Sequence, residues 1–334
     1  MILVTGATGL VGSHLLIALL ENNEKVRDLY RNPKALEKTK SLFDSYNKTS
    51  LFDAVEWVQA DITDVPSLES VFPNVTLVYH CAALISFDPN DEKALRKTNI
   101  EGTANVVNFC LAYQVKKLCY VSSIAALGDL KALEMMVTEE TEWNPEIAHS
   151  DYAISKYGAE MEVWRGQQEG LSVTVVNPGV ILGPGFWDAG SGLLFTQIAK
   201  GLPFYTKGIS GFVAVTDVVK SMMQSIKTES SGSRFIVVAE NISYETVVKT
   251  IAVALKVKAP RFYIRPYMTE VFWRIDGLLA FLFGKKRMLS QASARAVHQT
   301  DLYSNEKIKS EFHFQFQDVK QYILDIGKYY PQKK

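Results

Sequence analysis

Cysteine is scarce in this chain of 334 residues, which has three: Cys81, Cys110 and Cys119. Three is an odd number and too few for a disulfide framework, and each lies in an apolar stretch, so we expect buried, reduced thiols in a cytoplasmic protein. The first residues show no basic leader before an apolar stretch, so no signal peptide is expected. No run of about 18 uncharged apolar residues occurs, which argues against a membrane-spanning helix.

Neither positively nor negatively charged residues are in excess. Lys and Arg total 36 and Asp and Glu total 36, so the chain lacks the basic character expected of a nucleic-acid-binding protein. The five histidines are scattered without metal-ligand spacing, so no metal site is predicted. The apolar content of 47% suits a large core. The length suggests two domains, or one large α/β unit with an appendage.

The first 180 residues alternate between short β-type runs and segments of helical length. This alternation predicts a doubly wound, Rossmann-type α/β fold with a parallel sheet. We expect a dinucleotide-binding domain over 1–178, with a returning strand near 234–239. A smaller, mainly helical substrate-binding domain would comprise 179–233 and 240–334. The predicted strands are Ile2–Thr5, Val26–Tyr30, Val55–Gln59, Leu77–His80, Leu118–Ser122, Val173–Asn177 and Phe235–Ala239, and the predicted long helices are Gly9–Asn22, Asp91–Tyr113 and Tyr152–Gly170.

A glycine-rich segment joins the first predicted strand to the first predicted helix. It reads Thr5-Gly6-Ala7-Thr8-Gly9-Leu10-Val11-Gly12, and a loop in this context is typical of dinucleotide binding. Gly6 permits a tight turn, Gly9 lets the backbone approach a pyrophosphate, and Gly12 allows close helix–strand packing. The phosphates would meet the positive end of the helix. The alternative is a glycine-rich turn that binds nothing.

The end of the second strand bears on the choice of cofactor. An acidic residue there accepts hydrogen bonds from the ribose 2′-hydroxyl of NAD, whereas a basic one accommodates the 2′-phosphate of NADP. This strand ends Leu29-Tyr30-Arg31, without a carboxylate at its tip. The sequence therefore favours NADP, with Arg31 as the phosphate partner. NAD stays the alternative, because Asp28 points to the same side of the strand as Tyr30.

A second motif carries acid–base chemistry. Tyr152 and Lys156 stand four residues apart, on one face of a predicted helix. An adjacent ammonium favours the phenolate, so we expect a lowered pKa for Tyr152, which suits proton exchange with a carbonyl or alcohol oxygen. The preceding strand ends Val121-Ser122-Ser123, and a hydroxyl at the carboxyl end of a strand lies where α/β proteins place their sites.

Together these segments resemble the extended short-chain dehydrogenase/reductases, the epimerase/dehydratase group, over nearly the whole chain. The resemblance implies a catalytic set of Asn99, Ser123, Tyr152 and Lys156, with Asn99 positioning a water linked to Lys156. It also implies a homodimer built by pairing the helices that carry Asn99 and Tyr152. The implied cofactor-binding residues are Gly6, Thr8, Gly9, Leu10, Val11, Gly12, Arg31, Asp61, Ile62, Cys81, Ala82, Ala83, Tyr152, Lys156, Pro178, Gly179 and Val180.

Departures from the family pattern indicate the subtype. Sugar-nucleotide dehydratases carry an acidic pair after the serine strand, where residues 124–128 have no acid. Sugar-nucleotide epimerases usually bind a diphosphate through an arginine, where this chain has Ser210-Gly211-Phe212, and many members have Arg in place of Asn177. The chain is thus similar to the dihydroflavonol-reductase-like and 3β-hydroxysteroid-dehydrogenase-like branches. That similarity implies NADP-dependent reduction of an aldehyde or ketone on a mostly apolar small molecule.

Three alternatives remain open at this stage. The chain could be a nucleotide-sugar epimerase that uses NAD(P), or a non-catalytic dinucleotide-sensing protein, although sensing would not need Tyr152. Residues 256–288 combine eight basic side chains with many apolar ones. Within them, 266–288 is expected to be a lid or packing helix, with a helix that contacts the membrane interface as the alternative. Lys285-Lys286-Arg287 alone is expected to be a solvated loop.

Overall fold

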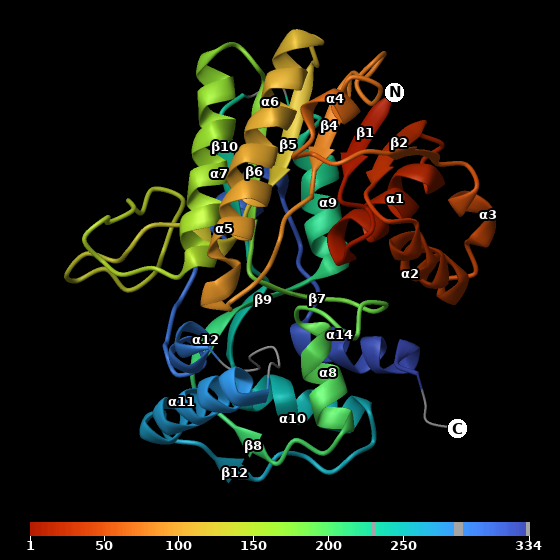
Figure 1. Ribbon diagram of the computed structural model, residues 1–334. Coiled ribbons are helices and arrows are strands. Elements are labelled where there is room, and N and C mark those ends of the chain that lie inside the picture. Colours follow the sequence, from red (N-terminus) through yellow and green to blue (C-terminus); the bar gives the residue numbers. More distant parts are fainter. Residues whose placement is uncertain (229–230, 284–289, 332–334) are drawn as a thin grey trace.

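The computed structural model describes residues 1–228, 231–283 and 290–331. Within these residues a seven-stranded sheet has the order β10-β6-β5-β4-β1-β2-β3 (Figure 1). All of its neighbouring strands run parallel, which confirms the doubly wound Rossmann-type prediction. The strands are β1 Ile2–Thr5, β2 Val26–Tyr30, β3 Glu56–Gln59, β4 Leu77–His80, β5 Lys117–Val121, β6 Val173–Pro178 and β10 Ser233–Val237.

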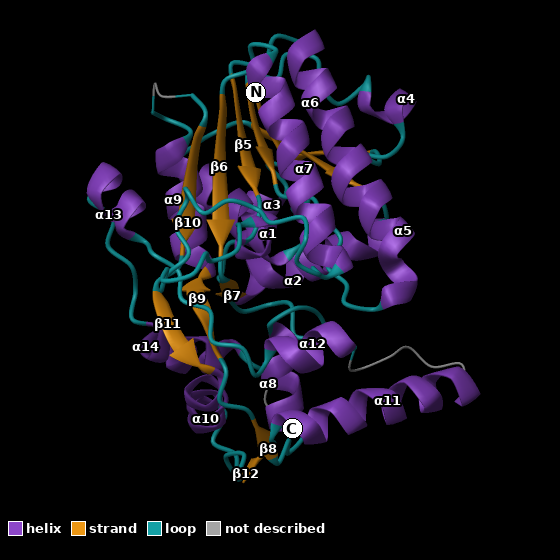
Figure 2. Ribbon diagram, turned by 90° about the vertical axis from the view of Figure 1, so that its left-hand side faces the viewer, coloured by secondary structure: helices purple, strands orange, loops and turns teal. Residues whose placement is uncertain are grey.

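Helices cover both faces of this sheet, as Figure 2 shows from the side. α1 (Leu10–Glu21) and α9 (Val215–Ser225) share one apolar core with one face of the sheet, and α6 (Gly102–Ala112) and α7 (Asp151–Gln168) share a second core with the other. Burial on both faces explains why the strands read as continuous apolar runs. The remaining helices of this part are α2 Pro33–Ser45, α3 Thr49–Phe52, α4 Val65–Leu68 and α5 Glu92–Leu95.

The helix predicted over Asp91–Tyr113 is divided. α5 is followed by a π-helical segment, Arg96–Glu101, before α6 begins. A π-helical turn inside a helix often marks a functional position, and this one contains Asn99.

The chain after Pro178 contains more strands than the sequence predicts. A small three-stranded sheet has the order β11-β9-β7, and β12 pairs with β8. These strands are short, and the two longest include Gly or Ser, so they lack the alternation that would reveal them. They are β7 Val180–Leu182, β8 Phe204–Tyr205, β9 Ile209–Ala214, β11 Glu240–Ser243 and β12 Phe262–Tyr263; the helices are α8 Gly192–Ala199, α10 Tyr244–Ala254, α11 Pro266–Phe283, α12 Gln291–Ala296, α13 Glu306–Phe312 and α14 Val319–Ile326.

Two features are absent from the described part of the chain. None of its helices is long and apolar enough to cross a membrane. None of its residues form a group of three or more His, Cys, Asp or Glu side chains suited to a metal ion. Residues 284–288, which include Lys285-Lys286-Arg287, lie outside the described residues.

Candidate active site

The glycine loop between β1 and α1 is built for close backbone packing. Gly6 has a φ of +81°, and a Cβ added there would come within 2.6 Å of the Cα of Ala82. A Cβ at Gly12 would come within 2.5 Å of the carbonyl oxygen of Gly6. Neither position accepts a larger residue, whereas a Cβ at Gly9 would meet only the Gly6 oxygen, at 3.4 Å. Gly9 therefore leaves the outer side of the loop open to a ligand.

The amino end of α1 completes this cradle. Gly9 is the N-cap residue and supplies no side chain to the helix, and no acidic residue lies in the first turn, which Leu10, Val11 and Gly12 form. The N–H groups of a first turn have no partner within their helix and attract anions. With Thr8 in the loop before it, this end of α1 fits the pyrophosphate of a dinucleotide.

The residues at the tip of β2 separate into a buried acid and an exposed cation. Asp28 is wholly buried and accepts a 3.4 Å hydrogen bond from the N–H of Ala7. Burial raises the pKa of Asp28 well above its usual range. Arg31 has a side chain 62% exposed, and its guanidinium lies 3.8 Å from a carboxylate oxygen of Asp61. A ligand reaching this tip would meet Arg31 and Asp61, whereas Asp28 lies beneath the glycine loop.

The other predicted cofactor positions differ in accessibility. Cys81 and Ala82 lie against Gly6, and Ala83 follows them. Ile62 is buried against Gly102 of α6, so it supports the neighbouring Asp61 rather than lining an open surface.

The segment after β6 joins the large sheet to the small one. Pro178 ends β6 and Val180 begins β7. A Cβ on Gly179 between them would come within 2.4 Å of the carbonyl oxygen of Gly211. This residue therefore allows β9 to approach closely at the carboxyl edge of the large sheet.

Ser123, Tyr152 and Lys156 meet where β5 ends beside α7. The side chain of Ser123 interacts with the Tyr152 hydroxyl and acts to lower its pKa, and the Ser123 hydroxyl accepts from the N–H of Ala125 at 3.1 Å. The buried Lys156 ammonium donates to the Tyr120 hydroxyl and to the Val121 carbonyl, both at 2.8 Å. Three residues predicted from separate motifs therefore lie together.

The protonation of this group differs from the expectation in one respect. Burial raises the pKa of Tyr152 above its ordinary value, although the hydrogen bond to Ser123 works in the opposite direction. Burial also lowers the pKa of Lys156 to about 7, opposed by the charge of Glu160. The expected lowering of the Tyr152 pKa by Lys156 is not found, because desolvation of the phenol dominates. Tyr152 is thus a protonated hydroxyl at neutral pH.

Asn99 is fully engaged by protein groups. Its side-chain oxygen accepts from the N–H of Leu84 at 2.7 Å, and its Nδ2 donates to the Leu84 carbonyl at 3.0 Å and to the Ser155 hydroxyl at 2.9 Å. These bonds tie the segment after β4 to α7, next to Tyr152 and Lys156. The side chain of Asn99 therefore positions the site through Leu84 and Ser155.

A buried polar network behind Ser123 was not predicted. Glu160 follows Lys156 by one helical turn and is 0% exposed. One of its oxygens accepts from Ser122 at 2.6 Å and from Asn177 at 3.0 Å. The other accepts from Trp164 at 3.2 Å and from Arg234 at 3.1 Å.

This network supports Ser123. Asn177 also donates to the Ser123 carbonyl at 2.9 Å, so it links Glu160 to the residue that bonds Tyr152. Many family members have Arg in place of Asn177. In this chain the cation next to Glu160 is instead Arg234, which lies on β10. The i+4 spacing from Lys156 could have identified Glu160, but no local signal marks Arg234.

Six aromatic residues that the sequence offers as candidates for lining an apolar substrate pocket are dispersed in the structure: Phe87, Trp143, Phe186, Trp187, Phe204 and Tyr205. The Phe87 ring lies 5.5 Å from the Tyr152 ring, centre to centre, and is 46% exposed. Trp143 stacks on Tyr157 of α7, with centres 4.3 Å apart. The remaining four lie elsewhere: Phe186 and Trp187 in apolar cores, Phe204 and Tyr205 in β8.

Comparison with known proteins agrees with this geometry. Residues 2–239 match the NAD dependent epimerase/dehydratase family. A Synechocystis protein provisionally named dihydroflavonol 4-reductase is 26% identical over 331 residues, which is 96% of this chain and 92% of that protein. Tetraketide alpha-pyrone reductase 2 of Arabidopsis thaliana is 31% identical over 70% of this chain and 76% of its own.

Epimerases are also among the relatives. UDP-glucose 4-epimerase of Vibrio cholerae is 27% identical over 83% of this chain and 82% of its own. The crystal structure of gox2253 superposes with a TM-score of 0.81 at 26% identity, covering 99% of this chain and 97% of that one. The chain therefore belongs to the NAD dependent epimerase/dehydratase family, among the extended short-chain dehydrogenase/reductases, and is an enzyme of the NAD(P)-dependent oxidoreductase type.

Proposed function

We propose that this protein reduces the carbonyl group of a mostly apolar small molecule, with NADP as its cofactor. The observation that carries this proposal is the buried, protonated Tyr152, bonded to Ser123 and one helical turn from Lys156. A protonated hydroxyl is the form needed to donate a proton to a carbonyl oxygen. Similarity to proteins named as reductases supports the same direction of reaction.

The residues of the chain take separate roles in this reaction. Ser123 donates a hydrogen bond to the substrate oxygen and holds it beside Tyr152. Tyr152 gives its hydroxyl proton to that oxygen as negative charge develops there. Lys156, an ammonium held on Tyr120 and Val121, stabilises the tyrosinate that remains. Asn99 and Glu160 hold these groups in place from behind.

The cofactor, when bound, would supply the hydride that the carbonyl carbon accepts. The glycine loop and the amino end of α1 would hold its pyrophosphate, and Asp61 its adenine. Lys156 would bind the nicotinamide ribose, flanked by Cys81 to Ala83 and by Pro178 to Val180. We assign residues 1–178 and the returning strand to cofactor binding, and 179–233 with 240–334 to substrate binding.

The residues of β9 indicate the class of substrate. Its Ser210-Gly211-Phe212 segment stands where an epimerase arginine would bind a diphosphate. A Cβ on Gly211 would come within 2.7 Å of the Val238 side chain, so this position is packed by apolar groups. Burying an unpaired diphosphate there would be costly, whereas burying an apolar substrate is favourable. Phe87 beside Tyr152 fits the same substrate class.

A substrate panel tests the proposal. Purified protein should oxidise NADPH with aliphatic, aromatic or steroid-like aldehydes and ketones, with weak activity across several of them, because apolar pockets discriminate poorly between hydrophobic shapes. UDP-glucose and UDP-galactose, run in parallel, should not interconvert. Epimerisation without net consumption of cofactor, together with co-purified NAD, would replace the reductase with the epimerase.

Arg31 provides the test of cofactor choice. Arg31→Ala should weaken NADPH binding about 10- to 150-fold, because hydrogen bonds to charged groups contribute about 1.5–3 kcal/mol, and should hardly change NADH binding. Titration calorimetry with both cofactors measures this difference. Lys25→Ala, which removes an exposed cation just before β2, is the matched control. Equal losses for NADPH and NADH would show that Arg31 does not bind the 2′-phosphate.

The dimer implied by the family is a further part of this proposal. α6 and α7 lie side by side on one face of the sheet (Figure 1), and this pair would face its copy in a homodimer. Light scattering of the purified protein at several concentrations measures the mass directly.

A further inference from the structure

α11 presents apolar side chains to the outside of the protein. Its exposed apolar residues recur every three or four positions, so they form a stripe along the helix. Each of them is 47–64% exposed. The stripe comprises Tyr267, Val271, Ile275, Leu278, Leu279 and Leu282.

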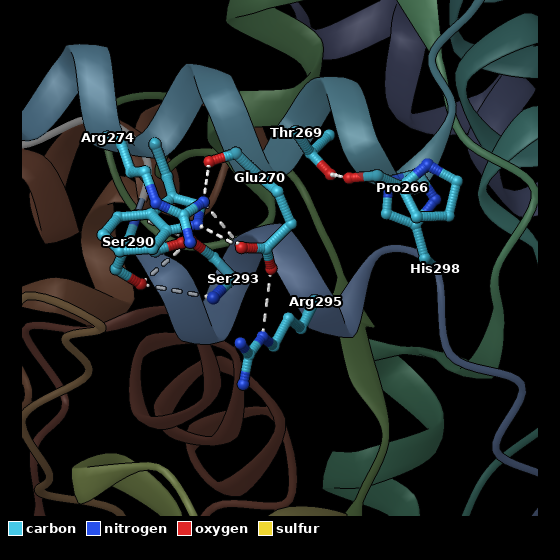
Figure 3. Close-up of polar contacts among 9 residues, drawn as sticks. Pro266, Thr269, Glu270, Arg274, Ser290, Ser293, Arg295 and His298 are labelled. Atoms are coloured by element: carbon cyan, nitrogen blue, oxygen red, sulfur yellow. Dashed lines mark hydrogen bonds and ion pairs between the residues drawn. The ribbon is translucent and has the colours of Figure 1, made fainter.

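The opposite side of α11, which packs on the protein, carries polar and small residues together with the half-buried Trp273, whose indole donates to Glu270 at 3.1 Å (Figure 3). Glu270 forms ion pairs with Arg274 at 2.8 Å and with Arg295 of α12 at 3.1 Å. Thr269 is buried and shares a 3.0 Å hydrogen bond with His298. Ala280 is also buried on this side. The helix is thus inverted relative to a surface helix, which faces the core with its apolar side.

Cations flank the apolar stripe. Lys256, Lys258, Arg261 and Arg265 lie in or near the segment between α10 and α11; all are exposed, and none forms an ion pair with a described residue. Phe262 and Tyr263 of β12, in the same segment, are 63% and 36% exposed. Apolar, aromatic and basic side chains therefore occur together on α11 and the segment that precedes it.

This end of the molecule is also accessible. α11 extends away from the body, lies below α12, and is distant from the large sheet (Figure 2). An 18-residue helix is about 27 Å long, so the stripe offers a long apolar contact. The contact surface, defined as α11 together with residues 256–265, is separate from the glycine loop.

We propose that this contact surface docks on an anionic lipid bilayer, with α11 lying in the interface. The apolar stripe would enter the boundary between headgroups and acyl chains, and the flanking cations would contact acidic headgroups. The two acidic residues of α11 do not oppose this arrangement, because Glu270 is neutralised by two arginines and Asp276 has an interaction of its own.

Charge favours a lipid surface over a second copy of the chain. A two-fold interface places the same patch on both partners, so both copies would bring the cations of residues 256–265 to it, while the two acidic residues of α11 already have partners. An anionic bilayer instead provides negative charge across the whole contact surface. A bilayer-binding surface and a dimer interface also differ in how they respond to lipid composition, because only the first depends on anionic lipid.

Vesicle flotation of the full-length protein tests the proposal. Vesicles of phosphatidylcholine with about one-third phosphatidylserine should carry the protein upward, and high salt should weaken this binding. Arg261→Gln/Arg265→Gln should lower binding to the anionic vesicles about thirtyfold, at about fivefold for each cation. Binding to pure phosphatidylcholine should change little in this variant.

The apolar stripe needs its own variant and control. Ile275→Glu/Leu278→Glu should lower binding to both kinds of vesicle at least about tenfold, because two apolar groups are replaced by charges. Val65→Glu, on the exposed α4 at the other end of the molecule (Figure 1), should bind as the wild type does. Failure of the wild type to float with anionic vesicles overturns the proposal. So does an Ile275→Glu/Leu278→Glu variant that splits an oligomer, by light scattering, while vesicle binding is unchanged.

Discussion

Replacing Tyr152 with phenylalanine should lower kcat by about 10²–10⁴-fold, the usual contribution of general acid catalysis. The substitution removes the hydroxyl that bonds Ser123 and leaves the ring, which packs against Phe87. Of the groups expected to bind the dinucleotide, only the Tyr152 hydroxyl is changed, so the dissociation constant for NADPH should stay close to the wild-type value. Steady-state kinetics with the best carbonyl of the panel and a cofactor titration measure the two quantities.

The control for this substitution lies on the same helix. Tyr157→Phe also removes a phenolic hydroxyl from α7, but this ring stacks on Trp143, away from Ser123. Its turnover should match the wild type. If Tyr152→Phe kept more than about a tenth of the wild-type rate, Tyr152 would not be the proton donor. A parallel loss of NADPH affinity would instead give Tyr152 a binding role.

The large sheet was predictable because its strands carry their own local signal. β1, β2 and β4 have the bounds that the sequence predicts, since each is a short run rich in Val, Leu, Ile or Tyr, and β1 is closed by Gly6. The small sheet carries no such signal. β11 is half-buried throughout and begins with Glu240 and Asn241, so its strand state depends on pairing with the distant β9, which only the tertiary fold provides.

The candidate site likewise contains residues that the sequence marks and residues that only the fold brings together. Tyr152 and Lys156 share a helical face, and Ser123 follows a strand, so spacing marks them as candidates and the family resemblance implies their roles. The partners of Glu160 cannot be identified in this way, because Arg234 lies 74 residues along the chain. The prediction of a lowered pKa for Tyr152 was also wrong. Sequence spacing shows a neighbouring cation but does not show how deeply the phenol is buried.

The Arg234–Glu160 pair gives the largest expected effect on stability. Arg234→Met keeps the length of the side chain but leaves the carboxylate of Glu160, which is 0% exposed, without its counterion. Removing one partner of a buried ion pair typically costs about 3–5 kcal/mol. The free energy of unfolding from guanidinium titrations should fall by that amount, because the remaining partners, Ser122, Asn177 and Trp164, carry no charge.

Two further variants separate the effect of the unpaired charge on stability from the effect of lost packing. In Glu160→Gln/Arg234→Met the buried charge is gone as well, so this double variant should be more stable than Arg234→Met alone, with the coupling obtained from a double-mutant cycle. Arg165→Met removes the partner of Glu162 and Glu169 on the surface of α7 and should cost less than about 1 kcal/mol. Equal losses for Arg234→Met and Arg165→Met would mean that Glu160 does not depend on Arg234. Glu160 would then be held behind Ser123 by Ser122, Asn177 and Trp164, without need of the cation that β10 supplies.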